Sequence, residues 1–353
     1  MGLIDEEILD SRKITSEDLC YCGSGNIYRE CCKKKDHDSW LSKEEIENIE
    51  KVVFYSGKAP KSHLKTMLGI NEKCFIAICK KKAIWSHTIS ASWMRSVFKE
   101  SSVSMPSLDW ENYLLKEVPI SKASIFMGWC KEHDYDLFQE IDQGFDINNS
   151  YHLNLMTYRS ISKEFRIKEN HLRQIYSFLC LSDSCNKDLC LSILLGEYLW
   201  VRDNYKLMTF VYNGIQTETR KGLKHRVFNL WKISPIFVSS AITPNRKPNK
   251  KRYEVLSLNL YTDKDSNGYF IISYPSWYVD SEKLYKKLKK EEKKETLIPC
   301  LNELISKNCD NIVCDKSRAE EKLVDDRNNP PLFFPYDTPT FDYIKPLSAI
   351  GKS

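Results

Sequence analysis

The spacing of hydrophobic positions changes along the chain and predicts elements of two kinds. From Tyr151 to Leu181, and again through the apolar run that ends at Val201, hydrophobic residues recur at helical spacing, which predicts two long helices. Between Lys206 and Trp277, short β-branched and aromatic runs separated by turns predict strands, the first of them around residues 205–215. The lysine-rich stretch from Asp280 to Asn308 returns to helical spacing. These patterns predict an α+β fold.

Composition and charge narrow the class of protein. Of the 353 residues, 42% are hydrophobic and 29% are charged, which is typical of a globular chain, and the net charge of +5 permits a nucleic-acid partner without requiring one. The first ten residues are acidic where a signal peptide is basic, and the run from Leu189 to Val201 is too short to span a membrane. We therefore expect a cytoplasmic protein without a membrane segment, in which thiols stay reduced.

Four of the thirteen cysteines lie close together near the N-terminus. They form a Cys-x-Cys pair and an adjacent Cys-Cys pair, and two glycines directly after the first pair allow the backbone to turn tightly. Four thiolates on a short loop supply the soft tetrahedral donors that zinc requires. We therefore predict a structural zinc site; the alternative is a redox-active or incidental cluster. The predicted ligands are Cys20, Cys22, Cys31 and Cys32.

The same stretch, CYCGSGNIYRECC, resembles the SEC-C motif. The similarity includes the C-x-C-G-S-G sequence, the aromatic Tyr28, the basic Arg29 and the terminal Cys-Cys, and it covers about 20 residues. SEC-C elements dock their proteins onto other proteins or ribosomes and are not themselves catalytic. The resemblance therefore implies a docking function and a protein partner for this part of the chain.

A second set of metal-ligating residues lies in the middle of the chain. Cys74 and Cys79 form a C-x4-C pair, and Cys130 and His133 form a C-x2-H pair about fifty residues later. Two such pairs, the second at the start of a predicted helix, are the ligand pattern of a treble-clef zinc finger. The alternative is a set of unrelated buried cysteines and a surface histidine.

The region between and just after these pairs resembles the HNH nuclease superfamily. His87 follows Cys79 by eight residues within KKKAIWSHTISASWM, and it matches by position the histidine that acts as general base in that family. Asp134 stands where the family usually has a histidine that binds the catalytic metal. The resemblance covers Cys74 to Asp142 and implies magnesium- or manganese-dependent cleavage of DNA or RNA.

The region also departs from the HNH pattern. Ser86 stands where an acidic residue usually precedes the base, and only Ser121 or Ser124 is near the position of the expected asparagine. Further metal ligands could come from carboxylates on the predicted helix, which are Asp136, Glu140 and Asp142. The alternative for His87 is a structural histidine whose ring nitrogens are hydrogen-bonded by its neighbours.

Charged residues elsewhere give weaker indications. Five cations without an intervening acid form a candidate nucleic-acid-binding loop between predicted strands, at Arg246, Lys247, Lys250, Lys251 and Arg252. On the first long predicted helix, Arg159, Arg166 and Glu164 have the spacing of surface ion pairs.

Together these features predict four parts. We expect an SEC-C zinc knuckle and helix in residues 1–55, an HNH-like treble-clef domain in 66–145, a helical segment in 150–204, and a β-rich domain with a C-terminal helix and irregular tail in 205–353. The predicted function is a nuclease with two structural Zn²⁺ ions, and the paired resemblances indicate a setting in bacterial antiphage defence. The alternative is a non-catalytic zinc-finger protein that binds nucleic acid or a protein partner.

Overall fold

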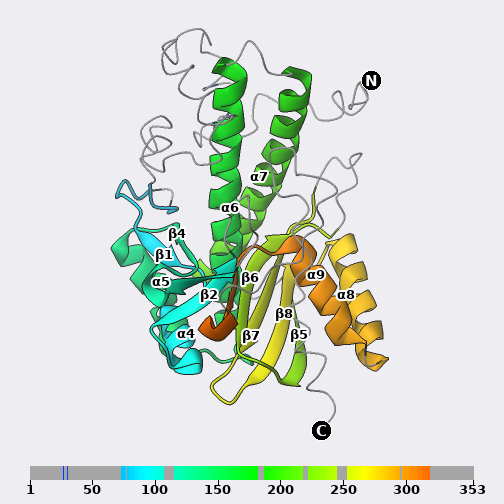
Figure 1. Cartoon of the computed structure of the whole chain (residues 1–353). Helices are drawn as coiled ribbons and strands as arrows, with labels where there is room; N and C mark the ends of the chain where they lie inside the picture. The colour runs from blue at the N-terminus through cyan, green and yellow to red at the C-terminus, as the bar shows by residue number, and fades with distance from the viewer. Residues whose placement is uncertain are drawn as a thin grey trace. The chain divides into compact units, whose positions relative to one another are not determined.

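The computed structural model of this chain describes residues 27, 30, 73–76, 78–106, 115–181, 187–217, 222–244, 253–294 and 296–318. Their fold is α+β, as the sequence predicts (Figure 1). The helices are α4 (Ala91–Phe98), α5 (Lys131–Gln143), α6 (Ser150–Leu181), α7 (Lys187–Gln216), α8 (Val279–Lys293) and α9 (Leu297–Asn308), with short 3-10 helices η4 (Ile120–Lys122) and η5 (Lys316–Arg318). The strands are β1 (Trp85–His87), β2 (Ser102–Pro106), β3 (Leu115–Pro119), β4 (Ile125–Met127), β5 (Leu223–Lys232), β6 (Ile236–Ile242), β7 (Leu256–Thr262), β8 (Asn267–Pro275) and β9 (Ile312–Cys314).

The chain divides into two compact units. The sheet unit contains Lys73–Glu164, Leu207–Pro244 and Glu254–Ser353, and the helical unit contains Met1–Glu72, Phe165–Lys206 and Asn245–Tyr253. Within the helical unit, α6 and α7 contact each other through Phe165 and Tyr205, whose ring centroids are 5.8 Å apart. The backbone N–H of Tyr253 donates to the Asp203 carboxylate on α7 at 2.7 Å.

The strand predicted around residues 205–215 is wrong, because these residues form the last turns of α7. Its aromatic and β-branched residues favour a strand locally. The buried positions instead follow helical spacing, and tertiary burial of that face determines the outcome. These positions are Leu207, Met208, Val211 and Ile215. The predicted helices before and after this region are confirmed as α6, the first part of α7, α8 and α9.

Seven strands of the sheet unit form one antiparallel sheet in the order β3-β2-β9-β6-β7-β8-β5. Strands β2 and β3 come from the predicted range 66–145, and the other five come from 205–353. Strands β1 and β4 pair separately in a two-stranded ribbon. The two predicted ranges therefore contribute to one sheet, and the ribbon is a distinct element beside it.

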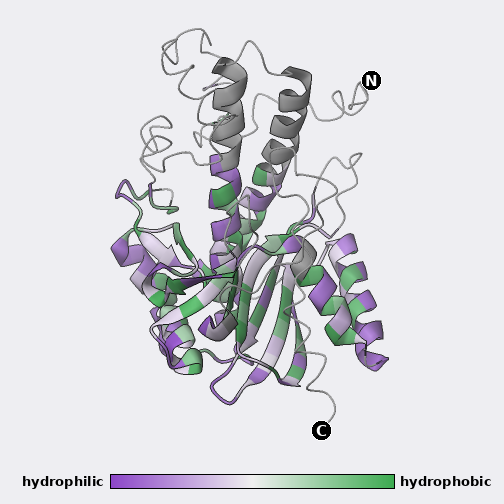
Figure 2. Ribbon diagram, in the orientation of Figure 1, coloured by the Kyte–Doolittle hydropathy of each residue, from purple (hydrophilic) through white to green (hydrophobic). Residues whose placement is uncertain are grey.

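One face of this sheet is apolar and is covered by α8 and α9. Leu256, Leu258 and Leu260 alternate along β7 on this face, and they form one buried cluster with Leu288 of α8 and Leu301 of α9. Hydrophobic and hydrophilic residues alternate along the strands and around α8 (Figure 2). The predicted strands β6, β7 and β8 are located in the sequence by a different signal, which is their short β-branched and aromatic runs bounded by turns.

The other face carries polar side chains that meet the first half of α6. Ser160 of α6 lies 2.8 Å from the Ser239 hydroxyl of β6 and donates to the Asn259 side-chain oxygen of β7 at 2.7 Å. On β5, His225 lies 2.9 Å from the Asn154 side-chain oxygen of α6 and 2.8 Å from the Ser273 hydroxyl of β8. Because a one-residue slip would break all these pairs, they determine the register of α6 on the sheet.

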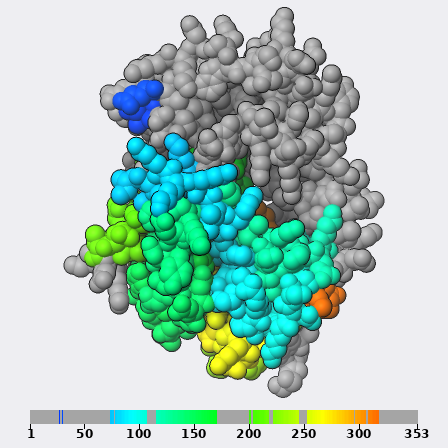
Figure 3. Space-filling model, turned by 90° about the vertical axis from the view of Figure 1, so that its left-hand side faces the viewer, coloured from blue at the N-terminus to red at the C-terminus, as the bar shows by residue number. Residues whose placement is uncertain are grey.

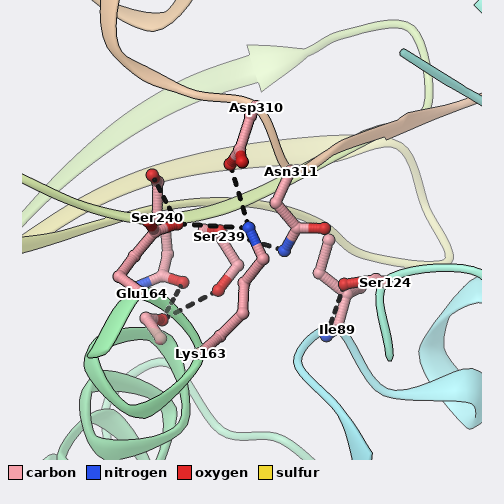
Figure 4. Close-up of polar contacts among 10 residues, drawn as sticks. Ile89, Ser124, Lys163, Glu164, Ser239, Ser240, Asp310 and Asn311 are labelled. Carbon is pink, nitrogen blue, oxygen red and sulfur yellow. Dashed lines mark hydrogen bonds and ion pairs between the residues drawn. The ribbon is translucent and has the colours of Figure 1, made fainter. Parts of the chain in front are cut away.

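Charged side chains are also buried at this contact. The Lys163 ammonium of α6 lies 2.9 Å from the Asp310 carboxylate before β9 and 3.2 Å from the Glu164 carboxylate, which also accepts a hydrogen bond from Ser240 at 3.1 Å (Figure 4). Burial by itself lowers the pKa of Lys163, but the two carboxylates outweigh it, so that the pKa is raised. The lysine is therefore a buried cation that is matched by two anions.

We predict that Lys163→Ala destabilises the protein by about 3 kcal/mol, because it leaves the buried Glu164 carboxylate without its cation. Lys283→Ala is the matched control: its ammonium pairs with Asp280 at 3.3 Å, but the side chain is 71% exposed, and its loss should cost less than about 1 kcal/mol. Urea denaturation measures both changes. Equal losses in the two variants would contradict a structural role for the buried cation.

A second prediction concerns His225. Burial lowers its pKa from 6.5 to about 4, so the unfolded chain binds this proton more readily than the folded one between these pH values. Stability should therefore fall as the pH drops from 6.5 towards 4, by roughly 2 kcal/mol from this group at pH 4.5. Denaturation curves at pH 7 and 4.5 should show a smaller fall for His225→Asn than for wild type. An identical fall would show that His225 does not contribute.

Candidate metal centre and adjoining site

The metal centre begins with a tight turn that carries the first ligand pair. The backbone N–H of Cys74 donates to the Lys81 carbonyl at 3.1 Å, and the N–H of Cys79 donates to the Ile76 carbonyl at 2.8 Å. Lys73 and Lys82 form an antiparallel bridge at the base of this turn. These bonds bring Cys74 and Cys79 to the same end of a short hairpin-like segment.

The second ligand pair lies where the β1–β4 ribbon leads into α5. Cys130 is the residue directly before α5, and His133 lies in its first turn. Trp129 is fully buried next to the ligands, and its ring lies 5.7 Å from Phe75, 5.4 Å from Phe126 and 4.6 Å from Phe138. This aromatic cluster holds the Cys74 segment, the ribbon and α5 together beneath the ligands.

The four predicted ligands of the second zinc site lie together. One donor atom from each of Cys74, Cys79, Cys130 and His133 lies within 4.8 Å of the others. The His133 Nδ1 atom is 3.3 Å from the sulfurs of both Cys74 and Cys130, and the sulfurs of Cys79 and Cys130 are 3.9 Å apart. The cysteines are free thiols. This group can hold a metal ion, and three thiols with one imidazole suit zinc.

The surroundings shift the pKa values of the two buried thiols, Cys74 and Cys130, in opposite directions. Burial raises the pKa of Cys74 to about 11. Burial also opposes ionisation of Cys130, but the backbone N–H of His133 and the neighbouring thiols outweigh it and lower that pKa. The positive end of α5 thus favours a thiolate at Cys130, which is the form that binds metal.

A cavity of about 350 Å³ adjoins this group. Its lining includes the ligand His133, together with Asp136, Tyr151 and Tyr212. The cavity gives access from solvent to the histidine side of the metal group.

His87 lies at the end of β1 and is not part of this group. Its Nε2 atom is 3.0 Å from the Ile120 carbonyl oxygen, which can only accept a hydrogen bond. Burial lowers the pKa of His87, and the charge of Arg159 acts in the same direction, whereas Asp142 and Asp134 oppose it. The ring is therefore neutral near pH 7, with a proton on Nε2 and a lone pair on Nδ1.

Asp134 lies in the first turn of α5, next to the ligand His133. Burial raises its pKa, and the charge of Arg159, the Ser86 hydroxyl and His87 act in the opposite direction. Its Oδ1 atom is buried and has no hydrogen-bond partner in the part of the chain that the structure describes. A buried carboxylate oxygen without a partner is costly, and it is available to a cation.

The predicted surface ion pairs on α6 are wrong. Arg159 is 2% exposed, and its guanidinium binds both oxygens of Asp142, at 2.7 and 3.0 Å. Arg166 and Glu164 are also buried: Arg166 pairs with Glu169 at 2.7 Å, and Glu164 pairs with Lys163. Helical spacing alone could not reveal this, because the partner of Arg159, Asp142, lies on α5.

The other carboxylates of α5 differ in their availability. Asp142 is engaged by Arg159, and Glu140 lies 2.8 Å from His152 Nε2. Asp136 lines the cavity beside His133. Among these candidates, Asp134 is thus the one with a buried oxygen that lacks a partner.

Other predicted sites lie outside the described residues. These are the ligands of the N-terminal zinc site, Cys20, Cys22, Cys31 and Cys32, and the basic loop from Arg246 to Arg252. The N-terminal zinc and the nucleic-acid-binding role of the loop stay predictions.

Comparison of the chain with protein-family models, with curated proteins and with solved structures found no match. Among the helices that the structure describes, none is both long enough and apolar enough to cross a bilayer.

We predict that the purified chain contains two zinc ions, and that replacing Cys74 and Cys79 by serine removes one of them, because serine is a poor zinc ligand. Replacing Cys31 and Cys32 should remove the other. Elemental analysis against protein concentration measures both. Cys300→Ser, which changes a thiol outside the group, should leave the content unchanged. Full zinc content in either double variant would disprove that assignment.

Proposed function

We propose that this protein is a zinc-stabilised nuclease similar to the HNH enzymes, with magnesium or manganese as its catalytic cofactor and DNA or RNA as its substrate. The observation that carries the proposal is the arrangement around one group of metal ligands. Strand β1 ends at His87, and the first turn of α5 contains Asp134. Both elements follow or contain residues of the group formed by Cys74, Cys79, Cys130 and His133.

His87 has the properties of a general base. The Ile120 carbonyl orients the ring by accepting from Nε2 at 3.0 Å, and burial lowers the pKa so that Nδ1 is free to accept a proton. A neutral imidazole in a constant orientation can take the proton from a water that attacks a phosphodiester. Thr88 and Ser86 do not provide the hydrogen bond to Nε2, so the ring is held from another element.

Asp134 is the proposed ligand for the catalytic cation. Its buried Oδ1 atom offers a hard oxygen of the kind that magnesium and manganese prefer. When bound, the cation supplies charge neutralisation to the phosphate and the leaving oxygen. Zinc in the Cys₃His group would have a filled shell, so its part is to hold the two side chains in place.

The departures from the HNH pattern are seen at two serines. Ser86, in the place of the usual acidic residue, is 1% exposed and contributes a hydroxyl near Asp134. Ser124, near the expected asparagine, accepts a hydrogen bond from the Ile89 N–H at 3.2 Å. The proposed cation site therefore depends on Asp134, water and substrate oxygens.

A second candidate is a non-catalytic zinc-finger protein that binds nucleic acid or a protein. The observation that favours it is the engagement of Glu140 by His152 and of Asp142 by Arg159, which removes two of the carboxylates of α5 that could bind the cation together with Asp134. For either candidate we propose a docking role for the SEC-C-like stretch, and antiphage defence as the setting, on the two resemblances described above.

The proposal is tested with a panel of supercoiled plasmid, single-stranded DNA and RNA, each with magnesium and with manganese. We predict metal-dependent nicking or cleavage by wild type, reduced at least about 100-fold in His87→Ala because the general base is lost. Asp134→Ala should show a similar loss. Gel electrophoresis measures the products, and zinc content and circular dichroism show that both variants stay folded.

Asp265→Ala is the control for Asp134→Ala, because it removes an exposed carboxylate that lies outside α5 and the ribbon. It should retain activity. Equal residual activity in wild type and His87→Ala would identify a contaminating nuclease and favour the non-catalytic candidate.

A further inference from the structure

A strongly basic surface lies at the turn that carries the first ligand pair. Lys73, Lys80, Lys81 and Lys82, here called the basic turn, are all exposed. The bridge between Lys73 and Lys82 brings the two ends of this lysine set together. The sequence contains no Asp or Glu between Lys73 and Lys99.

Among the residues that the structure describes, an acidic side chain of α5 contacts Lys81 of the basic turn. Glu132 of α5 forms an ion pair with Lys81, and the two side chains are 60–65% exposed. Such an exposed pair contributes little and exchanges readily with another anion. The turn therefore has an excess of positive charge directed at solvent, which suits a polymer of phosphates.

A large aromatic ring stands beside these cations. Trp85, the first residue of β1, is 54% exposed, whereas the next residue, Ser86, is 1% exposed. The alternation along the strand therefore directs Trp85 outward. Met127 is its cross-strand neighbour on β4, and Ile78 at the tip of the turn is 90% exposed.

The segment from Lys73 to Phe98 forms part of one face of the molecule, where it is drawn in light blue to cyan (Figure 3). Beside it on the same face lie residues of the green segment that includes α5 and the start of α6. A long ligand can thus lie across the basic turn and the ribbon together.

We propose that the basic turn and Trp85 form a binding site for single-stranded nucleic acid. The lysines neutralise backbone phosphates, and the Trp85 ring stacks on an unpaired base. A single strand fits better than a duplex, because the bases of a duplex already stack on one another and are not available to a side chain. One exposed tryptophan and two exposed isoleucines, Ile78 and Ile84, among four lysines offer too little apolar area for stable insertion into a lipid surface.

This site deepens the proposed function and rests on it for the choice of nucleic acid as substrate. Trp85 and His87 are two residues apart on β1, a distance of about 7 Å along a strand. A base stacked on Trp85 would therefore place a nearby phosphodiester beside the proposed general base. The group of Cys74, Cys79, Cys130 and His133 supports both the proposed binding site and the proposed active site, because its members come from the basic turn and from the start of α5.

The test measures binding rather than cleavage. The full-length chain with His87→Ala is titrated, by fluorescence anisotropy, into labelled oligonucleotides of single-stranded DNA, single-stranded RNA and duplex DNA. We expect a single strand to bind more tightly than the duplex; comparison of the DNA and RNA strands identifies the natural polymer. Replacing Lys80, Lys81 and Lys82 by glutamine should lower the slope of log affinity against log salt by about 2.

The aromatic part is tested separately. Trp85→Ala should weaken single-strand binding about tenfold or more, and Trp85→Phe should restore most of it, because a ring that can stack is retained. Trp231→Ala is the matched control, since Trp231 is 75% exposed on β5. Replacement of the exposed lysines Lys286, Lys287 and Lys290 of α8 by glutamine is the control for charge. Zinc content is measured for every variant.

Several outcomes would overturn the proposal. These are absence of binding to all three nucleic acids, equal effects of the α8 and basic-turn substitutions, unchanged binding in Trp85→Ala, or binding of the basic turn to anionic lipid vesicles alone. Because binding is measured without cleavage, its failure differs from failure of the nuclease proposal. Cleavage by wild type without binding at this surface would contradict the proposed binding site. Binding without cleavage by wild type would contradict the proposed nuclease activity.

Discussion

Three thiols and an imidazole from two segments about fifty residues apart lie within 4.8 Å of one another, and the neighbouring elements depend on this convergence. Cys74 and Cys79 hold the basic turn, Cys130 and His133 hold the start of α5, and the β1–β4 ribbon lies between them in sequence. Burial raises the pKa of Cys74, so the group is unfavourable as a set of thiolates unless a cation binds. Binding of a metal ion by this group would therefore be coupled to the folding of this region.

The metal centre is connected to the sheet through α5 and α6. Asp142, near the end of α5, holds both terminal nitrogens of Arg159, and the adjacent Ser160 contacts Ser239 and Asn259 on the sheet. Lys163, one turn further, pairs with Asp310 before β9. Buried polar pairs of this kind have few alternative partners, so they specify one position of α6. The ribbon that bears His87 is consequently carried by a rigid platform.

The sequence was informative where the signal is local and less so where it depends on distant partners. Ligand spacing located Cys74, Cys79, Cys130 and His133, because turns and helix starts determine where such residues point. Short β-branched and aromatic runs bounded by turns located β6 to β8, because this signal is also local. The burial of Arg159 and the pairing of β2 with β9 could not be predicted from the sequence, because their partners, Asp142 and Cys314, lie on other elements of the chain. The strand predicted around residues 205–215 failed because burial of a helical face outweighed local β propensity.

The ion pair between Arg159 and Asp142 affects the pKa of His87. Arg159 lowers the pKa of His87 and Asp142 raises it, so the two partners of this ion pair act in opposite directions, and burial, the largest cause, decides the result. A neutral base can thus persist beside a full cation–anion pair. A lone arginine would repel an incoming metal ion, and a lone aspartate would favour protonation of the imidazole. As a pair they join α5 to α6, with Arg159 4.1 Å above the Phe138 ring, and they leave His87 in the neutral form that the proposed role as general base would require.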